Sequence, residues 1–172
     1  MRELDVVGVR VEMPSNNPIV LLREREGDRM LPIWIGAPEA SAIAFAQQGV
    51  VPPRPLTHDL LKDVLEAVGR SLVEVRIVAV KDGIYHAELV LDGGTTVSAR
   101  SSDAIALALR TGSRILGAEE VLSTASVPVP DQDEDEVEKF REFLDHVSAE
   151  DFEGDPPGDA GDDTPGRDTP ER

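Results

Sequence analysis

Polar residues that could carry out chemistry gather at the expected starts of two helices, residues 54–59 (RPLTHD) and 100–103 (RSSD). Each start has a hydroxyl residue suited to an N-cap, Thr57 or Ser102, and an acid in the first turn that complements the helix dipole. Capping alone does not account for His58 or for an arginine beside each start. Because arginine and free backbone N–H groups together bind phosphate or carboxylate, plain capping and an anion site both remain open interpretations.

Several other kinds of site are excluded by what the sequence lacks. The chain has no cysteine, so it contains no disulfide, thiolate metal site or cysteine nucleophile. It has no Walker loop, GxGxxG, HExxH or zinc pattern, and surface roles are expected for His86 and His146. No apolar run approaches the roughly 18 residues of a membrane span, and no signal peptide pattern is present. We therefore expect a cytoplasmic protein without membrane association.

The elements that would position these residues are read from an internal repeat. Residues 33–47 (IWIGAPEASAIAFAQ) resemble residues 96–110 (TVSARSSDAIALALR), and an offset of 62 positions superposes Ala42 on Ala104. Each stretch is a short strand followed by an alanine-rich helix that is apolar nearly all round. We therefore predict a duplicated unit whose two helices, residues 39–48 and 102–110, are largely buried between sheets.

Alternating apolar residues and turn residues predict three strands ahead of each alanine-rich helix. In the first strand, Val7, Val9 and Val11 are expected to share one face, and Val73, Val75 and Ile77 do so in the second half. A further helix over residues 57–68 is expected as an insertion, with an apolar stripe made of Leu60, Leu61, Val64, Leu65 and Val68. The predicted fold class is α+β, with duplicated β-β-β-α units in a three-layer β/α/β arrangement plus the inserted helix and a C-terminal helix.

Charge separates the C-terminal part of the chain from the rest. Residues 1–130 carry 17 acidic and 13 basic side chains, whereas residues 131–172 carry 17 acidic and 4 basic ones. We predict a domain over residues 1–125, a linker over 126–134, an amphipathic helix over 135–152 and a disordered acidic tail over 153–172. A homo-oligomer, most simply a dimer, is expected because an exposed edge strand and the amphipathic helix both offer apolar surface.

Three motifs in the same order and separation resemble the bifunctional nuclease (BFN) domain: residues 32–43 (PIWIGAPEASAI), 54–61 (RPLTHDLL) and 100–110 (RSSDAIALALR). The resemblance covers about residues 2–125. Plant relatives are described as acting on both DNA and RNA, so it implies a nuclease that hydrolyses phosphodiester bonds of DNA, RNA or both. The family's fold, a duplicated β-β-β-α arrangement in three layers, agrees with the repeat.

Motif matching to this family gives two groups of candidate site residues. The resemblance implies catalytic roles for His58, Asp59, Asp103 and Glu39, and substrate-binding roles for Arg54, Thr57, Arg100 and Ser102. One route would use His58 as a base and the two arginines on the phosphate. A metal route would instead hold Mg²⁺ or Mn²⁺ with the carboxylates of Asp59, Asp103 and Glu39. The sequence leaves both routes open.

The charge distribution does not favour ordinary nucleic-acid binding. The predicted domain contains only two lysines, Lys62 and Lys81, and aromatic residues make up 3% of the chain. Nucleic acid is still the partner that the family resemblance implies, and its binding would require a local patch of arginines. The alternative function is a non-enzymatic regulatory module that binds a small anionic ligand or a protein partner.

Overall fold

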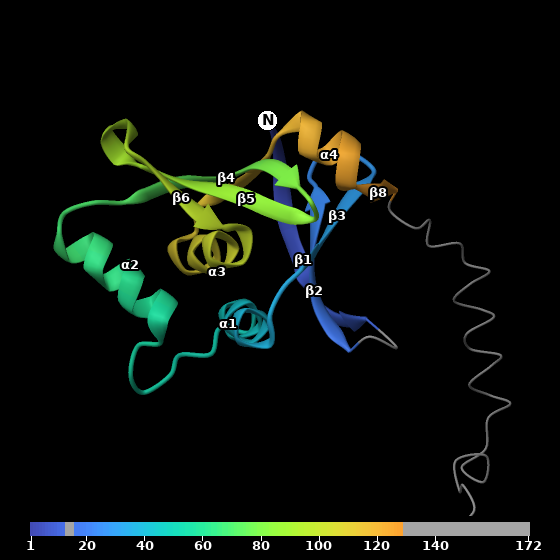
Figure 1. The fold of residues 1–172 in the computed structure, drawn as a ribbon. Coiled ribbons are helices and arrows are strands. Elements are labelled where there is room, and N and C mark those ends of the chain that lie inside the picture. The colour runs from blue at the N-terminus through green and yellow to red at the C-terminus, as the bar shows by residue number, and fades with distance from the viewer. Residues whose placement is uncertain (13–15, 129–172) are drawn as a thin grey trace, which may run out of the picture. The chain divides into compact units, whose positions relative to one another are not determined.

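The computed structural model describes residues 1–12 and 16–128, and within this part the chain contains two copies of one β-β-β-α unit (Figure 1). The first copy consists of β1 (Arg2–Glu12), β2 (Asn17–Glu24), β3 (Arg29–Trp34) and α1 (Ala37–Gln47). The second consists of β4 (Leu72–Lys81), β5 (Ile84–Leu91), β6 (Thr96–Arg100) and α3 (Ser101–Thr111). The α+β class and the duplication predicted from the sequence are confirmed. The predicted helix over 135–152 and tail over 153–172 lie outside the described residues.

Four further elements complete the described part. Helix α2 (Thr57–Ala67) is inserted between the two copies, as predicted. The second copy is followed by β7 (Arg114–Gly117), α4 (Glu119–Ala125) and β8 (Val127–Pro128), none of which the sequence patterns indicated. The short strand β8 occupies the beginning of the predicted linker and pairs with β3 through Met30. No helix in residues 1–12 and 16–128 has the length and apolar character needed to span a membrane.

All eight described strands belong to one sheet with the order β6-β5-β4-β7-β1-β2-β3-β8. Within each copy, consecutive strands pair antiparallel and form an arm of three strands. Strand β7 joins the two arms, because Ile115 pairs with Val75 in parallel register and with Leu4 in antiparallel register. Among the described strands, the two copies of the unit are therefore connected in the sheet only through a strand that belongs to neither.

The two arms curve around the repeated helices, which is consistent with the predicted three-layer β/α/β arrangement (Figure 1). Helix α3 packs against β4, β5 and β6, whereas α1 packs against β1, β2 and α3. The arms also approach each other directly, since the Tyr85 hydroxyl on β5 donates a 3.1 Å hydrogen bond to the Pro32 carbonyl on β3. Helix α4 contacts both β4 and β3. The core thus lies where helices and both arms meet.

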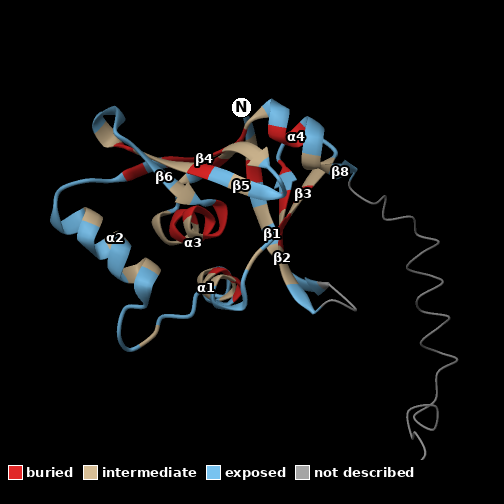
Figure 2. Cartoon of the chain, viewed as in Figure 1, coloured by how far each residue is buried: buried red, intermediate tan, exposed pale blue. Residues whose placement is uncertain are grey.

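The two alanine-rich helices differ in burial, which corrects the prediction that both are largely buried (Figure 2). Residues 104–108 of α3 are at most 1% exposed, so this helix is enclosed as expected. In α1 only Ala40 and Ile43 are buried, and Phe45 is 40% exposed. The difference follows from position, because α3 has neighbours on several sides while α1 covers the outer side of α3 and one arm.

Irregular pairing in the first strand of each copy alters the predicted faces. A bulge between Val6 and Gly8 in β1 shifts the alternation, so that Val7 is exposed although Val9 packs on the core. Val11, on the same face as Val9 but near the end of the strand, is also exposed. In β4 the register shifts between Leu72 and Glu74, which leaves Val73 46% exposed. A bulge cannot be read from alternation alone, because it changes the phase on which the alternation depends.

Helix α2 turns most of its predicted apolar stripe away from the core. Leu60, Leu61, Val64 and Val68 are between 39% and 65% exposed, and only Leu65 packs against the buried cluster. The side of α2 that faces the domain instead carries His58, Asp59 and Lys62, which are more buried than the stripe. A strong apolar stripe indicated the helix correctly but did not indicate which side contacts its own chain.

Candidate functional site

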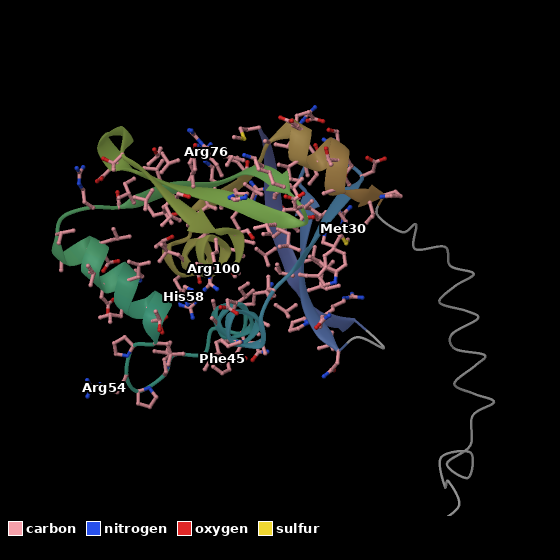
Figure 3. The ribbon with its side chains drawn as sticks, viewed as in Figure 1. Met30, Phe45, Arg54, His58, Arg76 and Arg100 are labelled. Carbon is pink, nitrogen blue, oxygen red and sulfur yellow. The ribbon has the colours of Figure 1, made fainter. Side chains whose placement is uncertain are left out.

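The first turns of α1, α2 and α3 meet at one place and bring together the polar residues predicted from the sequence (Figure 3). Glu39 is in the first turn of α1, His58 and Asp59 are in that of α2, and Asp103 is in that of α3. Acids in these positions complement the positive ends of the helix dipoles. The RPLTHD and RSSD segments therefore lie together in space, since His58 contacts Asp103.

A continuous chain of contacts runs through this meeting point. His58 Nε2 lies 3.2 Å from Asp103 Oδ1, and Arg100 donates to both oxygens of the same carboxylate at 2.6 and 3.0 Å. Arg100 also pairs with Glu39 at 3.0 Å, which connects α1 to the other two helices. The His58 side chain is only 13% exposed, whereas Arg100 is 67% exposed. The imidazole of His58 is therefore largely buried between the helices, and the guanidinium of Arg100 lies at the solvent-exposed edge of the site.

A small residue permits the position of Glu39. Its carboxylate lies over Gly36, the N-cap of α1, where an added Cβ would come within 2.3 Å of Glu39 Oε2. A larger residue at position 36 would displace the carboxylate from this position, from which its other oxygen contacts Arg100. The sequence motif containing Gly36 and Glu39 therefore has a local structural explanation.

A second ion pair holds α2 against the other end of α3. The Arg110 guanidinium donates from Nε to Asp59 Oδ1 at 2.5 Å and from Nη1 to the Ala106 carbonyl at 2.8 Å. The other oxygen of Asp59 accepts the Leu56 amide at 2.9 Å. Asp103 and Arg110 are seven residues apart and so share a face of α3. Asp59 thus positions the helix that carries His58.

Both aspartates of the α2–α3 contact are stabilised as carboxylates. Burial by itself would raise the pKa of Asp103, but hydrogen bonds from Arg100 and His58 outweigh it and the pKa lies below its ordinary value. The same balance holds for Asp59, where burial is outweighed by Arg110 and the Leu56 amide. Hydrogen bonding to Asp103 raises the pKa of Arg100. The site therefore consists of paired charges near neutral pH.

Three predicted substrate-binding residues take positions that the sequence did not indicate. Arg54 lies on the loop before α2, separate from His58 and Arg100 (Figure 3). Thr57 is exposed and follows the N-cap Leu56, and Ser102 lies inside α3 and is 7% exposed. The expectation that Thr57 and Ser102 are N-caps is wrong, because the N-caps are Leu56 and Arg100 and neither makes a side-chain cap hydrogen bond.

The carboxylates proposed for the metal route do not form a metal-binding group. Within residues 1–12 and 16–128, no three His, Cys, Asp or Glu side chains are placed to hold a metal ion. Asp59 is bound by Arg110, while Asp103 and Glu39 share Arg100. The geometry therefore does not fit Mg²⁺ or Mn²⁺ held by these three residues.

Arg110 belongs to this site and lies within the third sequence motif, but it was not among the candidate site residues. Its side chain is 8% exposed and its partner is one of the predicted acids. The available signal was its spacing of seven residues from Asp103, which places both on one side of a helix. Arg110 was instead counted with the apolar helix sequence that surrounds it.

Fold, repeat and site together define the class of protein, and comparison with known proteins agrees. The chain belongs to the bifunctional nuclease domain family, whose model matches residues 20–130. Relatives include Uncharacterized protein MT1877 and Uncharacterized protein Rv1829 of Mycobacterium tuberculosis, from strains CDC 1551 / Oshkosh and ATCC 25618 / H37Rv. Each is 55% identical over 161 residues, which cover 88% of this chain and 98% of the relative.

Proposed function

We propose that this protein hydrolyses phosphodiester bonds of DNA and RNA, with His58 as the general base. The observation that carries the proposal is the 3.2 Å contact between His58 and Asp103 in a chain of the bifunctional nuclease domain family. A histidine oriented by a carboxylate is a common device for removing a proton from an attacking hydroxyl group or water.

The two ring nitrogens of His58 take different roles in this proposal. If Nε2–H donates to Asp103, then Nδ1 carries the lone pair that accepts the proton. Asp103 is positioned to stabilise the imidazolium that forms, because its lowered pKa keeps it ionised near neutral pH. Asp59 has a positioning role, since its partners Arg110 and Leu56 hold the first turn of α2.

Arg100 is the group best placed to bind the phosphate. Its Nε and Nη2 contact Asp103 and Glu39, and no residue within 1–12 and 16–128 binds its Nη1, on a side chain that is 67% exposed. A guanidinium at this position would contact a phosphoryl oxygen and stabilise the charge that develops there. Because a single exposed arginine neutralises little charge, we expect single-stranded rather than duplex substrates.

The test is cleavage of labelled single-stranded DNA and RNA by the purified full chain, with and without EDTA. We expect cleavage to persist in EDTA, because the three carboxylates are bound by arginines rather than grouped around a common centre. His58→Ala should reduce the rate about 100-fold or more. Arg23→Ala, at an exposed arginine on β2, is the matched control and should retain the rate. Equal cleavage by His58→Ala would overturn the role of His58 as the general base.

A second candidate is the non-enzymatic regulatory module that binds a small anion or a protein partner. One observation favours it: the charged groups of the site are already paired with one another and tie three helices together. Such a network can stabilise the contact between the three helices without taking part in catalysis. If wild type cleaves neither substrate while His58→Ala lowers the melting temperature, the non-enzymatic interpretation replaces the catalytic one.

A further inference from the structure

A pocket of about 400 Å³ lies beside the candidate site, between the end of α1, the following loop, α2 and the end of α3. Its apolar wall contains Val50, Val51, Pro52, Pro55 and Leu109. Its volume falls within the range of small-molecule sites, about 300–1,000 Å³. The pocket shares Asp59 and Arg110 with the candidate site.

The polar edge of the pocket carries two cationic side chains. Arg110 uses Nε and Nη1 for Asp59 and Ala106, and no residue of the described ranges accepts from its Nη2. Since no side-chain N or O atom of those ranges is buried without a partner, Nη2 keeps some accessible surface, and Arg110 is one of the residues that line the pocket. Lys62 Nζ lies 3.7 Å from Glu66, beyond hydrogen-bond distance, and is able to turn towards a ligand.

The pocket is close enough to the candidate site to hold a part of the same substrate. Arg110 lies seven positions after Asp103 on α3, which corresponds to about 10 Å along the helix. His58 and Asp59 are adjacent residues, and they face Asp103 and Arg110 respectively. A strand with its phosphodiester at His58 could therefore place a neighbouring nucleotide in the pocket.

We propose that the pocket binds one nucleotide next to the scissile bond, which rests on the proposed nuclease function. The base lies against the valines and prolines, and the phosphate binds Arg110 Nη2 and Lys62. Apolar contact of this kind accepts any base, because every base has an apolar face. The pocket lining has two acids, Asp59 and Asp63, and two cations, Lys62 and Arg110. Arg110 contacts Asp59 through Nε, so Asp63 is the acid whose removal should favour a phosphate here.

The first test adds adenosine 5′-monophosphate to the full chain and measures the changes in amide chemical shifts. Adenosine and inorganic phosphate are added in separate titrations. We expect the nucleotide to perturb residues 50–55 and the α2–α3 contact, and to bind more tightly than either fragment. Val51→Glu and Lys62→Met should each weaken binding about tenfold, and Asp63→Asn should strengthen it. Val73→Glu, at an exposed valine outside the pocket, is the matched control and should bind as wild type does.

The second test separates the pocket from the catalytic proposal. Lys62→Met should raise KM for single-stranded oligonucleotides while leaving kcat nearly unchanged, because the pocket contributes binding and no chemistry. Absence of nucleotide binding in a protein that cleaves would overturn the pocket assignment and leave the nuclease proposal intact. Nucleotide binding in a protein that does not cleave would retain the pocket as a nucleotide site and overturn the nuclease proposal. Equal shifts from phosphate alone would also overturn the pocket assignment.

Discussion

At the level of single residues, Asp59 and Asp103 make different contacts across the α2–α3 interface. Asp103 contacts the proposed base His58, whereas Asp59 holds the helix through Arg110 and a backbone amide. Substitution should therefore separate catalysis from positioning. The two residues are equivalent in the sequence motifs, each being an acid in a first turn, and only the structure distinguishes them.

The first prediction concerns Asp103→Asn, which retains the size of the side chain and removes its charge. We expect kcat for oligonucleotide cleavage to fall by about 10-fold or more, because the imidazolium of His58 loses its stabilising charge. KM should change less than kcat. The measurement is steady-state cleavage of single-stranded DNA, and an unchanged kcat would contradict the role given to Asp103.

The second prediction concerns Asp59→Asn and pH. The pKa of Asp59 is lowered on folding, so its contribution to stability is complete above its unfolded pKa, near 3.8, and is lost as pH falls through the lower folded pKa. Asn at this position should reduce the free energy of unfolding by about 1–3 kcal/mol at pH 7. The difference from wild type should shrink towards pH 3.

Urea unfolding at pH 7, 5 and 3 checks this, with the exposed turn residue changed in Asp28→Asn as the control. A difference that is constant with pH would mean that the ion pair with Arg110 does not contribute to stability.

At the level of elements, the third prediction tests the enclosed helix. Ala106 in α3 is 0% exposed, so Ala106→Leu would force extra methylenes into a packed core. We expect the free energy of unfolding to fall by about 1–3 kcal/mol. Ala67→Leu, at the exposed end of α2, makes the same chemical change and should alter it by less than about 0.5 kcal/mol. Thermal or urea denaturation measures both, and equal effects would show that α3 is not tightly enclosed.

The fourth prediction concerns the expected homo-oligomer and the exposed stripe of α2. Val64 on this stripe and Val97 on the edge strand β6 are similarly exposed, 47% and 45%. We expect Val64→Lys to convert the oligomer to a monomer and Val97→Lys to leave it intact, because the stripe gathers four apolar side chains on one helix. Light scattering at micromolar concentration gives the mass. If Val97→Lys dissociates the oligomer and Val64→Lys does not, the interface lies at the sheet edge. A monomeric wild type would exclude both proposed interfaces.

The elements show clearly what the sequence could predict. Periodicity located the six strands and two alanine-rich helices of the repeat, because two-residue and 3.6-residue patterns are local. It could not locate β7 and β8, which have four and two residues and are defined by pairing with distant strands. It found the apolar stripe of α2 but not the direction in which the stripe faces, because an apolar side chain looks the same in sequence whether it faces the core or not. Arg110 was missed for a related reason, since its partner is 51 residues away.

At the level of the whole molecule, the fifth prediction concerns residues 154–172. This segment contains six acidic and two basic residues, so deleting it removes a net charge of −4. We expect the melting temperature to stay the same, because the segment has no bulky apolar residue to contribute to a core. Any binding of single-stranded nucleic acid should strengthen, most at low salt where screening is weakest. Fluorescence anisotropy at two salt concentrations measures this, and equal affinity for both forms would show that the tail has no electrostatic role.

The joining strand β7 also has a consequence for how the protein is made. While the chain is being synthesised, each three-strand arm can pair within itself as soon as its own residues have emerged. Leu4 can pair with Ile115 only after residue 115 has been synthesised, so one edge of β1 has no strand partner until nearly the whole domain has left the ribosome. Two half-built sheets with free edges therefore coexist in the nascent chain, and arms from neighbouring chains can pair wrongly during that interval. Both edges are covered only when β7 has been synthesised and pairs with β1 and β4.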